Sequence, residues 1–170
     1  MKRVPILLVL SLALVGGLAV RTQAEQRIGG GVEYLRTLGD IKDDNGFDEN
    51  AFGIFASYQY GARLFKIEAD VEWIPDFGGT GKALIQPQAY ALIGGLIYGG
   101  AGIGIGNFDG EWESDPFYAL RAGVDFNLSG LDFDVFAVYR FQDAEMTENL
   151  GTSDLDAVTF CALIRFRIGG

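Results

Sequence analysis

The sequence predicts an all-β fold, an eight-stranded antiparallel up-and-down transmembrane β-barrel, and three observations support this prediction. First, the stretch 64–73 alternates apolar and charged residues at every position, which is the pattern of a strand with two chemically different faces. Second, its length exceeds the five or six residues usual in soluble strands and suits a tilted strand that crosses a bilayer. Third, seven other segments alternate in the same way, and no stretch of helical period competes with them after Gln26.

The amino end has the features of a secretory signal peptide. Basic Lys2-Arg3 precedes an apolar run over 4–20, and Thr22-Gln23-Ala24 supplies small residues at the positions before a cut. An uncleaved membrane anchor is the alternative, although the apolar run is marginal in length for a spanning helix. We expect a signal peptide over 1–24, cleavage after Ala24, and one barrel domain over 25–170.

Eight alternating segments follow, joined by connections that are long and short in turn. The segments are 27–38, 50–60, 62–74, 82–93, 96–107, 116–128, 131–142 and 155–168. The short connections are Tyr60-Gly61-Ala62, Gly94-Gly95 and Ser129-Gly130, where glycine supplies the positive φ that tight hairpins require. The long connections are 39–49, 75–81, 108–115 and 143–154. Four long loops therefore lie at one end of the barrel, and three tight turns and both termini lie at the other.

This pattern resembles the small eight-stranded outer-membrane barrels, the family of the OmpA transmembrane domain and OmpX, over the whole mature chain. The resemblance implies a monomer in a Gram-negative-type outer membrane, inserted by the barrel assembly machinery. It also implies long loops outside the cell, short turns in the periplasm, and a closed sheet without edge strands. One feature departs from the family: many members end on an aromatic residue, whereas this chain ends Arg167-Ile168-Gly169-Gly170 after a last aromatic at Phe166.

The apolar face of the segments sorts its aromatic residues toward the two ends. Near the loop end lie Tyr34, Phe52, Trp73, Tyr118, Tyr139 and Phe141, and near the turn end lie Tyr58, Tyr60, Phe65, Phe126, Phe133 and Phe166. Aliphatic residues such as Ile67 and Ala122 fill the belt between them. Two aromatic girdles around an aliphatic belt are typical of a surface that faces lipid. The alternative, a soluble periplasmic ligand-binding barrel with an apolar cavity, gives no reason for such sorting.

The other face carries the charges that a lipid-embedded barrel would turn inward. They are Glu33, Lys66, Glu68, Asp70, Glu72, Arg121, Asp125, Asp132, Asp134, Arg140, Arg165 and Arg167. Buried charges must pair or meet water, and eight strands enclose an interior only just wide enough for side chains. The sequence therefore allows two interpretations, a plugged and salt-bridged lumen or a narrow channel for small solutes. Apolar residues at inward positions, such as Phe55 and Leu163, favour plugging.

The hairpin turns predict which of these charges meet. A hairpin folded about Ser129-Gly130 sets Asp125 near Asp134, and because both are carboxylates, a cation must lie between or beside them. If the last two strands reach the rim together, the predicted network pairs Arg165 with Asp134 and Arg167 with Asp132, next to Asp125. We expect Gly29 and Gly31 on the first strand to leave space for the two guanidinium groups, and Glu33 to offer a further acceptor.

Composition and motifs argue against several other functions. The chain has no histidine, which removes most acid/base and metal chemistry, and its net charge of −10 argues against nucleic acid as a partner. Gly100, Gly102 and Gly104 keep a period of two and lack the spacing of a dinucleotide-binding loop. Cys161, the single cysteine, suits a small buried filler and has no partner in the chain for a disulfide. We expect neither an enzyme nor a cofactor.

The long loops hold most of the remaining acidity, for example Asp43-Asp44, Glu111 and Glu148. The Asp43-Asp44-Asn45-Gly46 stretch does not fit a calcium-binding EF-hand, because the flanking positions lack the required acidic residues. We expect these loops to be solvated at the outer face. Loose bridging by divalent cations to lipopolysaccharide is the functional alternative, alongside contact with outer-membrane lipid.

Overall fold

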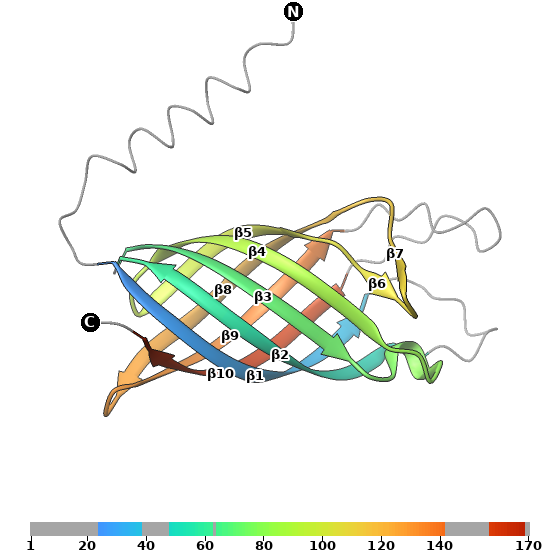
Figure 1. Ribbon diagram of the computed structural model, residues 1–170, viewed down its shortest axis with the longest axis horizontal. Helices are drawn as coiled ribbons and strands as arrows, with labels where there is room; N and C mark the ends of the chain where they lie inside the picture. The colour runs from blue at the N-terminus through green and yellow to red at the C-terminus, as the bar shows by residue number, and fades with distance from the viewer. Residues whose placement is uncertain (1–23, 39–47, 63, 142–156, 169–170) are drawn as a thin grey trace, which may run out of the picture.

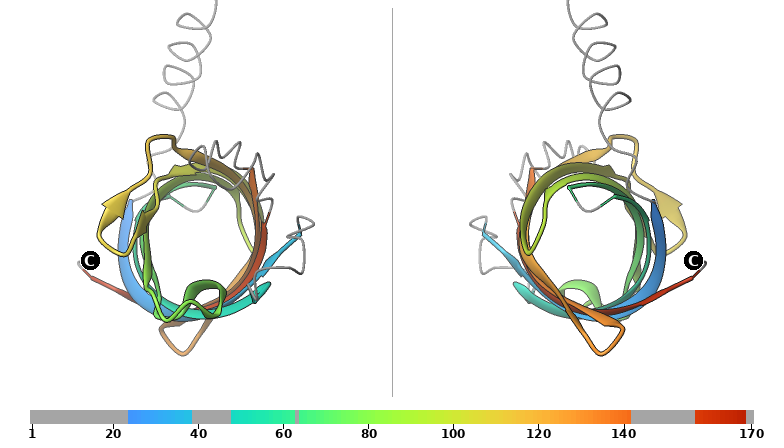
Figure 2. Two further views of the ribbon diagram at one scale, coloured as in Figure 1. Left: turned by 90° about the vertical axis from the view of Figure 1, so that its right-hand side faces the viewer. Right: turned by 90° about the vertical axis from the view of Figure 1, so that its left-hand side faces the viewer.

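Eight long antiparallel strands close into a barrel in the computed structural model, which describes residues 24–38, 48–62, 64–141 and 157–168 (Figures 1 and 2). The barrel strands are β1 (Glu25–Thr37), β2 (Asn50–Gly61), β3 (Phe65–Ile74), β4 (Leu84–Gly94), β5 (Ile97–Gly104), β8 (Phe117–Leu128), β9 (Leu131–Phe141) and β10 (Ala157–Arg167). Strand β1 pairs with both β2 and β10, and the pairing of β3 with β4 completes the circle. The predicted fold class is therefore confirmed.

The two ends of the barrel differ as the connections predict. Ser129 and Gly130, with φ of 54° and 90°, turn β8 directly into β9, and the connections from β2 to β3 and from β4 to β5 are also short. Strand β1 begins and β10 ends at this same turn end, on the left in Figure 1. The predicted signal peptide up to Gln23, most of the first loop and the whole of the fourth loop lie outside the described residues.

The third loop contains a hairpin that the sequence pattern did not predict. The expected strand 96–107 is too long, because β5 ends at Gly104 and the chain then forms β6 (Asn107–Phe108) and β7 (Glu111–Trp112). A 3₁₀ turn, η2 (Phe77–Gly79), lies in the second loop. No helix within the described ranges is long and apolar enough to cross a membrane.

The strands expose one face and bury the other. On β3, Ile67 is 52% exposed and Val71 is 50% exposed, whereas Glu68 between them is completely buried. The interior is tightly packed: a Cβ added at Gly102 would lie 2.4 Å from Cδ1 of Tyr90. Large apolar side chains thus cover the outside, and the charged ones lie inside together with an apolar cluster that includes Phe55 and Leu163, as predicted. An apolar outside around a charged inside is the reverse of the arrangement in a soluble protein.

Candidate functional site: the charged interior face of strand β3

The interior face of β3 carries four consecutive inward charges, and they contact strands on the far side of the barrel. Lys66, Glu68, Asp70 and Glu72 alternate with the exposed apolar residues and are all buried. Around the barrel, β3 and β9 are four strands apart in both directions, so they face each other across the interior. Ion pairs from β3 to β8, β9 and β10 therefore cross the barrel.

The middle layer is a ring of alternating charges formed by two carboxylates and two guanidinium groups. Glu68 on β3 binds Arg121 of β8 at 2.9 Å and also binds Arg165 of β10. Asp134 on β9 binds the same two residues, Arg121 at 3.2 Å and Arg165 at 2.7 Å. Gln59 donates a further hydrogen bond of 2.6 Å to Glu68. All four ring side chains are inaccessible to solvent, so each charge is compensated within the ring.

Aromatic rings enclose the Arg121 guanidinium on its remaining sides. Its Cζ atom lies 3.4 Å from the centroid of Phe136 and 5.3 Å from that of Tyr90, distances at which a cation is attracted to an aromatic face. Tyr98 accepts a 3.0 Å hydrogen bond from Arg121 Nε and donates from its hydroxyl to Asp134 at 2.9 Å. Tyr98 thus completes the polar contacts of the ring, and sequence reasoning missed it, although the period of two along β5 places it inward.

The layer nearer the loops contains more carboxyl groups than cations. Arg140 on β9 binds Glu72 directly across the barrel and donates a 2.9 Å hydrogen bond to Gln86. Glu33 on β1 is 98% buried, since only 2% of its surface is exposed, and neither of its carboxyl oxygens has a hydrogen-bond partner. The charges that act on its carboxyl are those of Glu72, Arg140 and Asp70. Glu33 is therefore the one inward carboxyl among the described residues with both oxygens unpartnered.

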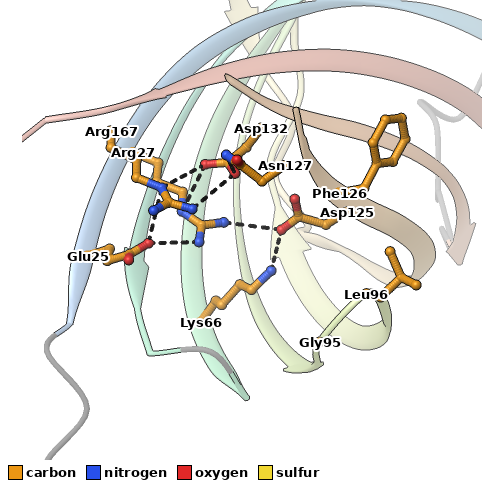
Figure 3. Close-up of a pocket in the computed structure, with 10 residues that line it drawn as sticks. All are labelled: Glu25, Arg27, Lys66, Gly95, Leu96, Asp125, Phe126, Asn127, Asp132 and Arg167. Carbon is orange, nitrogen blue, oxygen red and sulfur yellow. Dashed lines mark hydrogen bonds and ion pairs between the residues drawn. The ribbon is translucent and has the colours of Figure 1, made fainter. Parts of the chain in front are cut away.

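The layer at the turn end balances its charges around an open cavity of about 480 Å³ (Figure 3). Asp125 binds Lys66 and, at 3.2 Å, Arg27, which also lies 3.3 Å from Asp132. Arg167 lies at the mouth with 45% of its side chain exposed, 3.4 Å from Asp132. Arg27 was not among the predicted lumen charges, although it shares the inward period of Gly29 and Glu33.

The contacts predicted for this network are present, but the network spans two layers, since Arg165 and Asp134 belong to the middle ring, and its register is partly wrong. Asp125 is paired with Asp134 across the β8–β9 hairpin, and separate cations compensate them. The contacts of Arg165 with Asp134 and of Arg167 with Asp132 are both present. The backbone, however, pairs Arg165 with Asp132, two residues from the predicted register, and the long side chain reaches its partner diagonally.

The expected role of β1 in this network needs two corrections. Gly29 does make room for Arg165, because a Cβ there would lie 2.8 Å from the Arg165 Cγ atom. The space at Gly31 is filled by the ring of Phe55 instead of a guanidinium. Glu33 does not accept from either arginine, because it pairs with Cys161, four residues or about 13 Å along β10 from Arg165.

Comparisons with known proteins agree with this geometry at the level of the fold. No protein-family model and no curated protein matches the sequence. The crystal structure of Neisserial surface protein A aligns with a TM-score of 0.63 at 13% identity, over 85% of this chain and 99% of that chain. The outer membrane protein Ail of Yersinia pestis, determined in a phospholipid bilayer nanodisc, aligns with a TM-score of 0.51 at 16% identity, over 86% of this chain and 100% of that chain.

The chain has the fold of the small eight-stranded outer-membrane β-barrels. In this fold the outer face is as distinctive as the interior. The structure exposes nine of the twelve aromatic residues assigned to the girdles, with fractions between 41% and 72%: Phe52, Tyr58, Tyr60, Phe65, Trp73, Tyr118, Phe126, Phe141 and Phe166. The other three are half-buried against aromatic neighbours, Tyr34 on Phe52, Phe133 on Phe126 and Tyr139 on Phe141.

Two exposed aromatic residues near the loop end were missed. Phe160, 56% exposed, is paired with Tyr34 across β1 and β10, and the period of two along β10 would have identified it. Trp112, 59% exposed, lies on the unpredicted β6–β7 hairpin and had no strand pattern to reveal it.

The interior offers little reactive chemistry. Cys161 is buried between strands, and no cluster of three or more His, Cys, Asp or Glu in the described part of the chain is arranged to hold a metal ion. The carboxylates of the middle ring are neutralised by arginines at hydrogen-bond distance. The arrangement is suited to holding opposite strands together.

Proposed function

We propose that this protein is an integral outer-membrane β-barrel of a Gram-negative-type envelope, with a structural or surface-interaction role and no enzymatic activity. The observation that carries the proposal is the inversion of its two faces. Large apolar side chains cover the outside, with Ile97 at 74% and Phe52 at 72% exposure, while ten charged residues in the described part of the chain are buried inside. Contact with lipid would satisfy this outer face, since water would leave a continuous apolar surface exposed.

The same inversion argues against a soluble periplasmic ligand-binding barrel, which would place apolar side chains around an inner cavity. The test is cell fractionation followed by electrophoresis of boiled and unboiled samples. We expect the mature protein, cleaved after Ala24, in the outer-membrane fraction, with a shift in mobility on boiling as the closed barrel opens. Recovery of the protein in the soluble periplasm would contradict the proposal.

We further propose that the lumen is plugged by its ion pairs. Three observations support this: the Lys66–Asp125 pair near the turns, the ring around Glu68 in the middle, and the Glu72 contact with Arg140 nearer the loops all cross the barrel. The Lys66–Asp125 pair borders the open cavity at the turn end, so the plug consists of the middle and loop-side layers, where eight strands enclose an interior only just wide enough for side chains. Planar bilayers containing the refolded barrel should show no discrete conductance steps, whereas reproducible small steps would favour the narrow channel for small solutes.

The expected partners are outer-membrane lipid, lipopolysaccharide and, during insertion, the barrel assembly machinery, with the barrel itself a monomer. Among the described loop residues, Asp48, Glu49, Glu111 and Asp115 are acidic and lie at the loop end. Divalent cations would let such groups approach the phosphates of lipopolysaccharide. In membranes containing lipopolysaccharide, calcium should raise the unfolding temperature of the barrel and EDTA should lower it. The same unfolding temperature with calcium and with EDTA would show that the acidic loops do not bind lipopolysaccharide through cations.

A further inference from the structure

The β6–β7 hairpin projects from the barrel at the loop end and lies outside the ring of barrel strands (Figure 2). Its two central residues, Asp109 and Gly110, have φ of 54° and 92°, as a tight two-residue hairpin turn requires. Trp112 lies in β7, the strand at the free edge, and 59% of its surface is exposed. A tryptophan joins an apolar ring system to an N–H donor, which suits it to a surface where apolar and polar surroundings meet.

The hairpin is fixed to the barrel by several contacts. Phe108 of β6 pairs with Leu84 of β4, and the Asp109 amide donates a 3.1 Å hydrogen bond to the Ala83 carbonyl. Lys82 binds the Asp109 carboxylate at 2.9 Å, and this hydrogen bond raises the pKa of the lysine. The Phe108 ring packs edge-on against Phe77 of η2, with centroids 6.2 Å apart. Trp112 is therefore presented in a defined position.

The pairing register places this position relative to the loop-end girdle. Trp73 pairs with Ile85, Ile85 with Asn107, and Asn107 with Trp112, so the two tryptophans lie three strands apart in one row of the sheet, which ends at Trp112 on the edge strand β7. Because the strands are tilted, a row climbs toward the loop end by about 3 Å per strand, or about 9 Å over three strands. In Figure 1 the climb from β3 through β4 to the hairpin runs toward the loop end.

We propose that Trp112 sits in the headgroup layer of the outer leaflet, with the hairpin overhanging the surrounding lipid. This inference rests on the proposed membrane location. Trp73 would lie at the boundary between acyl chains and headgroups. Trp112, about 9 Å further toward the loop end and outside the barrel wall, would reach the polar layer in which amphipathic rings are favoured. The hairpin would then hold the third loop against the membrane surface, away from the barrel mouth.

Single-tryptophan variants test the proposal, because the chain contains only these two tryptophans. Trp73→Phe reports on Trp112, and Trp112→Phe reports on Trp73. Each full-length barrel is refolded into phosphatidylcholine vesicles that carry a nitroxide on the headgroup or bromine on the acyl chain. We expect the headgroup nitroxide to quench Trp112 at least as strongly as Trp73, the acyl bromines to quench Trp73 more strongly, and aqueous iodide to quench Trp112 weakly.

The two reporters separate failure of this inference from failure of the proposed function. If Trp73 is quenched from the lipid while Trp112 is quenched only by iodide, the hairpin stands in water or awaits a protein partner, and the inference is overturned. If neither tryptophan is quenched by either lipid probe while the barrel is folded by its gel mobility, the membrane location itself is wrong.

Discussion

In the loop-side layer of the lumen, we expect the two partners of the described ion pair to differ in how much their loss destabilises the barrel. Arg140 binds Glu72, and the Nε atom of Arg140 has no hydrogen-bond partner. Glu33 lies within electrostatic reach of both, and its carboxyl has no donor. Loss of the arginine would leave two buried carboxyls without a countercharge, whereas loss of Glu72 would leave the arginine facing Glu33.

The expected change in the free energy of unfolding depends on which buried charges each variant leaves unpaired. Arg140→Met should lower the free energy of unfolding by about 3 to 5 kcal/mol, the typical cost of leaving a buried charge unpaired. Glu72→Gln should cost about 1.5 kcal/mol, the lower end for a hydrogen bond to a charged group, since Glu33 remains as an acceptor. Glu33→Gln should leave stability unchanged or higher, because it removes an uncompensated carboxyl and keeps the side-chain volume. The double variant with Glu72→Gln and Arg140→Met should be more stable than Arg140→Met alone.

The assay is unfolding in urea of barrels refolded into phospholipid vesicles, followed by tryptophan fluorescence and by gel mobility. The control is the same set of variants compared at two salt concentrations, since a buried pair is screened far less than an exposed one. Equal losses for Glu72→Gln and Arg140→Met would refute the reasoning. So would a loss above about 1 kcal/mol for Glu33→Gln, because that would show that its carboxyl makes a stabilising contact.

Three further predictions concern the middle ring, the outer face and the packing of β5. Arg165→Ala and Asp134→Ala should show a coupling of about 0.5 to 3 kcal/mol in a double-mutant cycle of urea unfolding, and strictly additive losses would mean that their contact is not formed. Ala122→Arg on the outer belt should cost about 2 to 4 kcal/mol in vesicles and Tyr34→Arg near the loop end much less; equal costs at both depths would contradict the membrane orientation. Gly102→Ala should lower stability by about 1 to 3 kcal/mol through overpacking, and a neutral effect on the urea midpoint would show that the neighbouring ring moves freely.

The sequence by itself determined the architecture, because a period of two is a local property of a strand. The alternation over 64–73 identifies β3 and assigns every one of its side chains to a face, and the same pattern recovers all eight barrel strands. Turn chemistry determined the pairing of Asp125 with Asp134, since a two-residue turn at Ser129-Gly130 fixes the register of its hairpin. The third loop escaped this reasoning, because two-residue strands such as β6 and β7 are too short to show a period.

Only the tertiary structure decided which charges meet. Neighbouring strands can be registered from a short turn, but β9 and β10 are joined by a long loop, and the predicted register there is wrong by two residues. Strands that face each other across the barrel share no turn at all, so the contacts of Glu68 with Arg121 and Arg165, and of Glu72 with Arg140, could not be predicted. These contacts depend on the stagger of the whole closed sheet, which is set by all eight pairings together and by no single stretch of sequence.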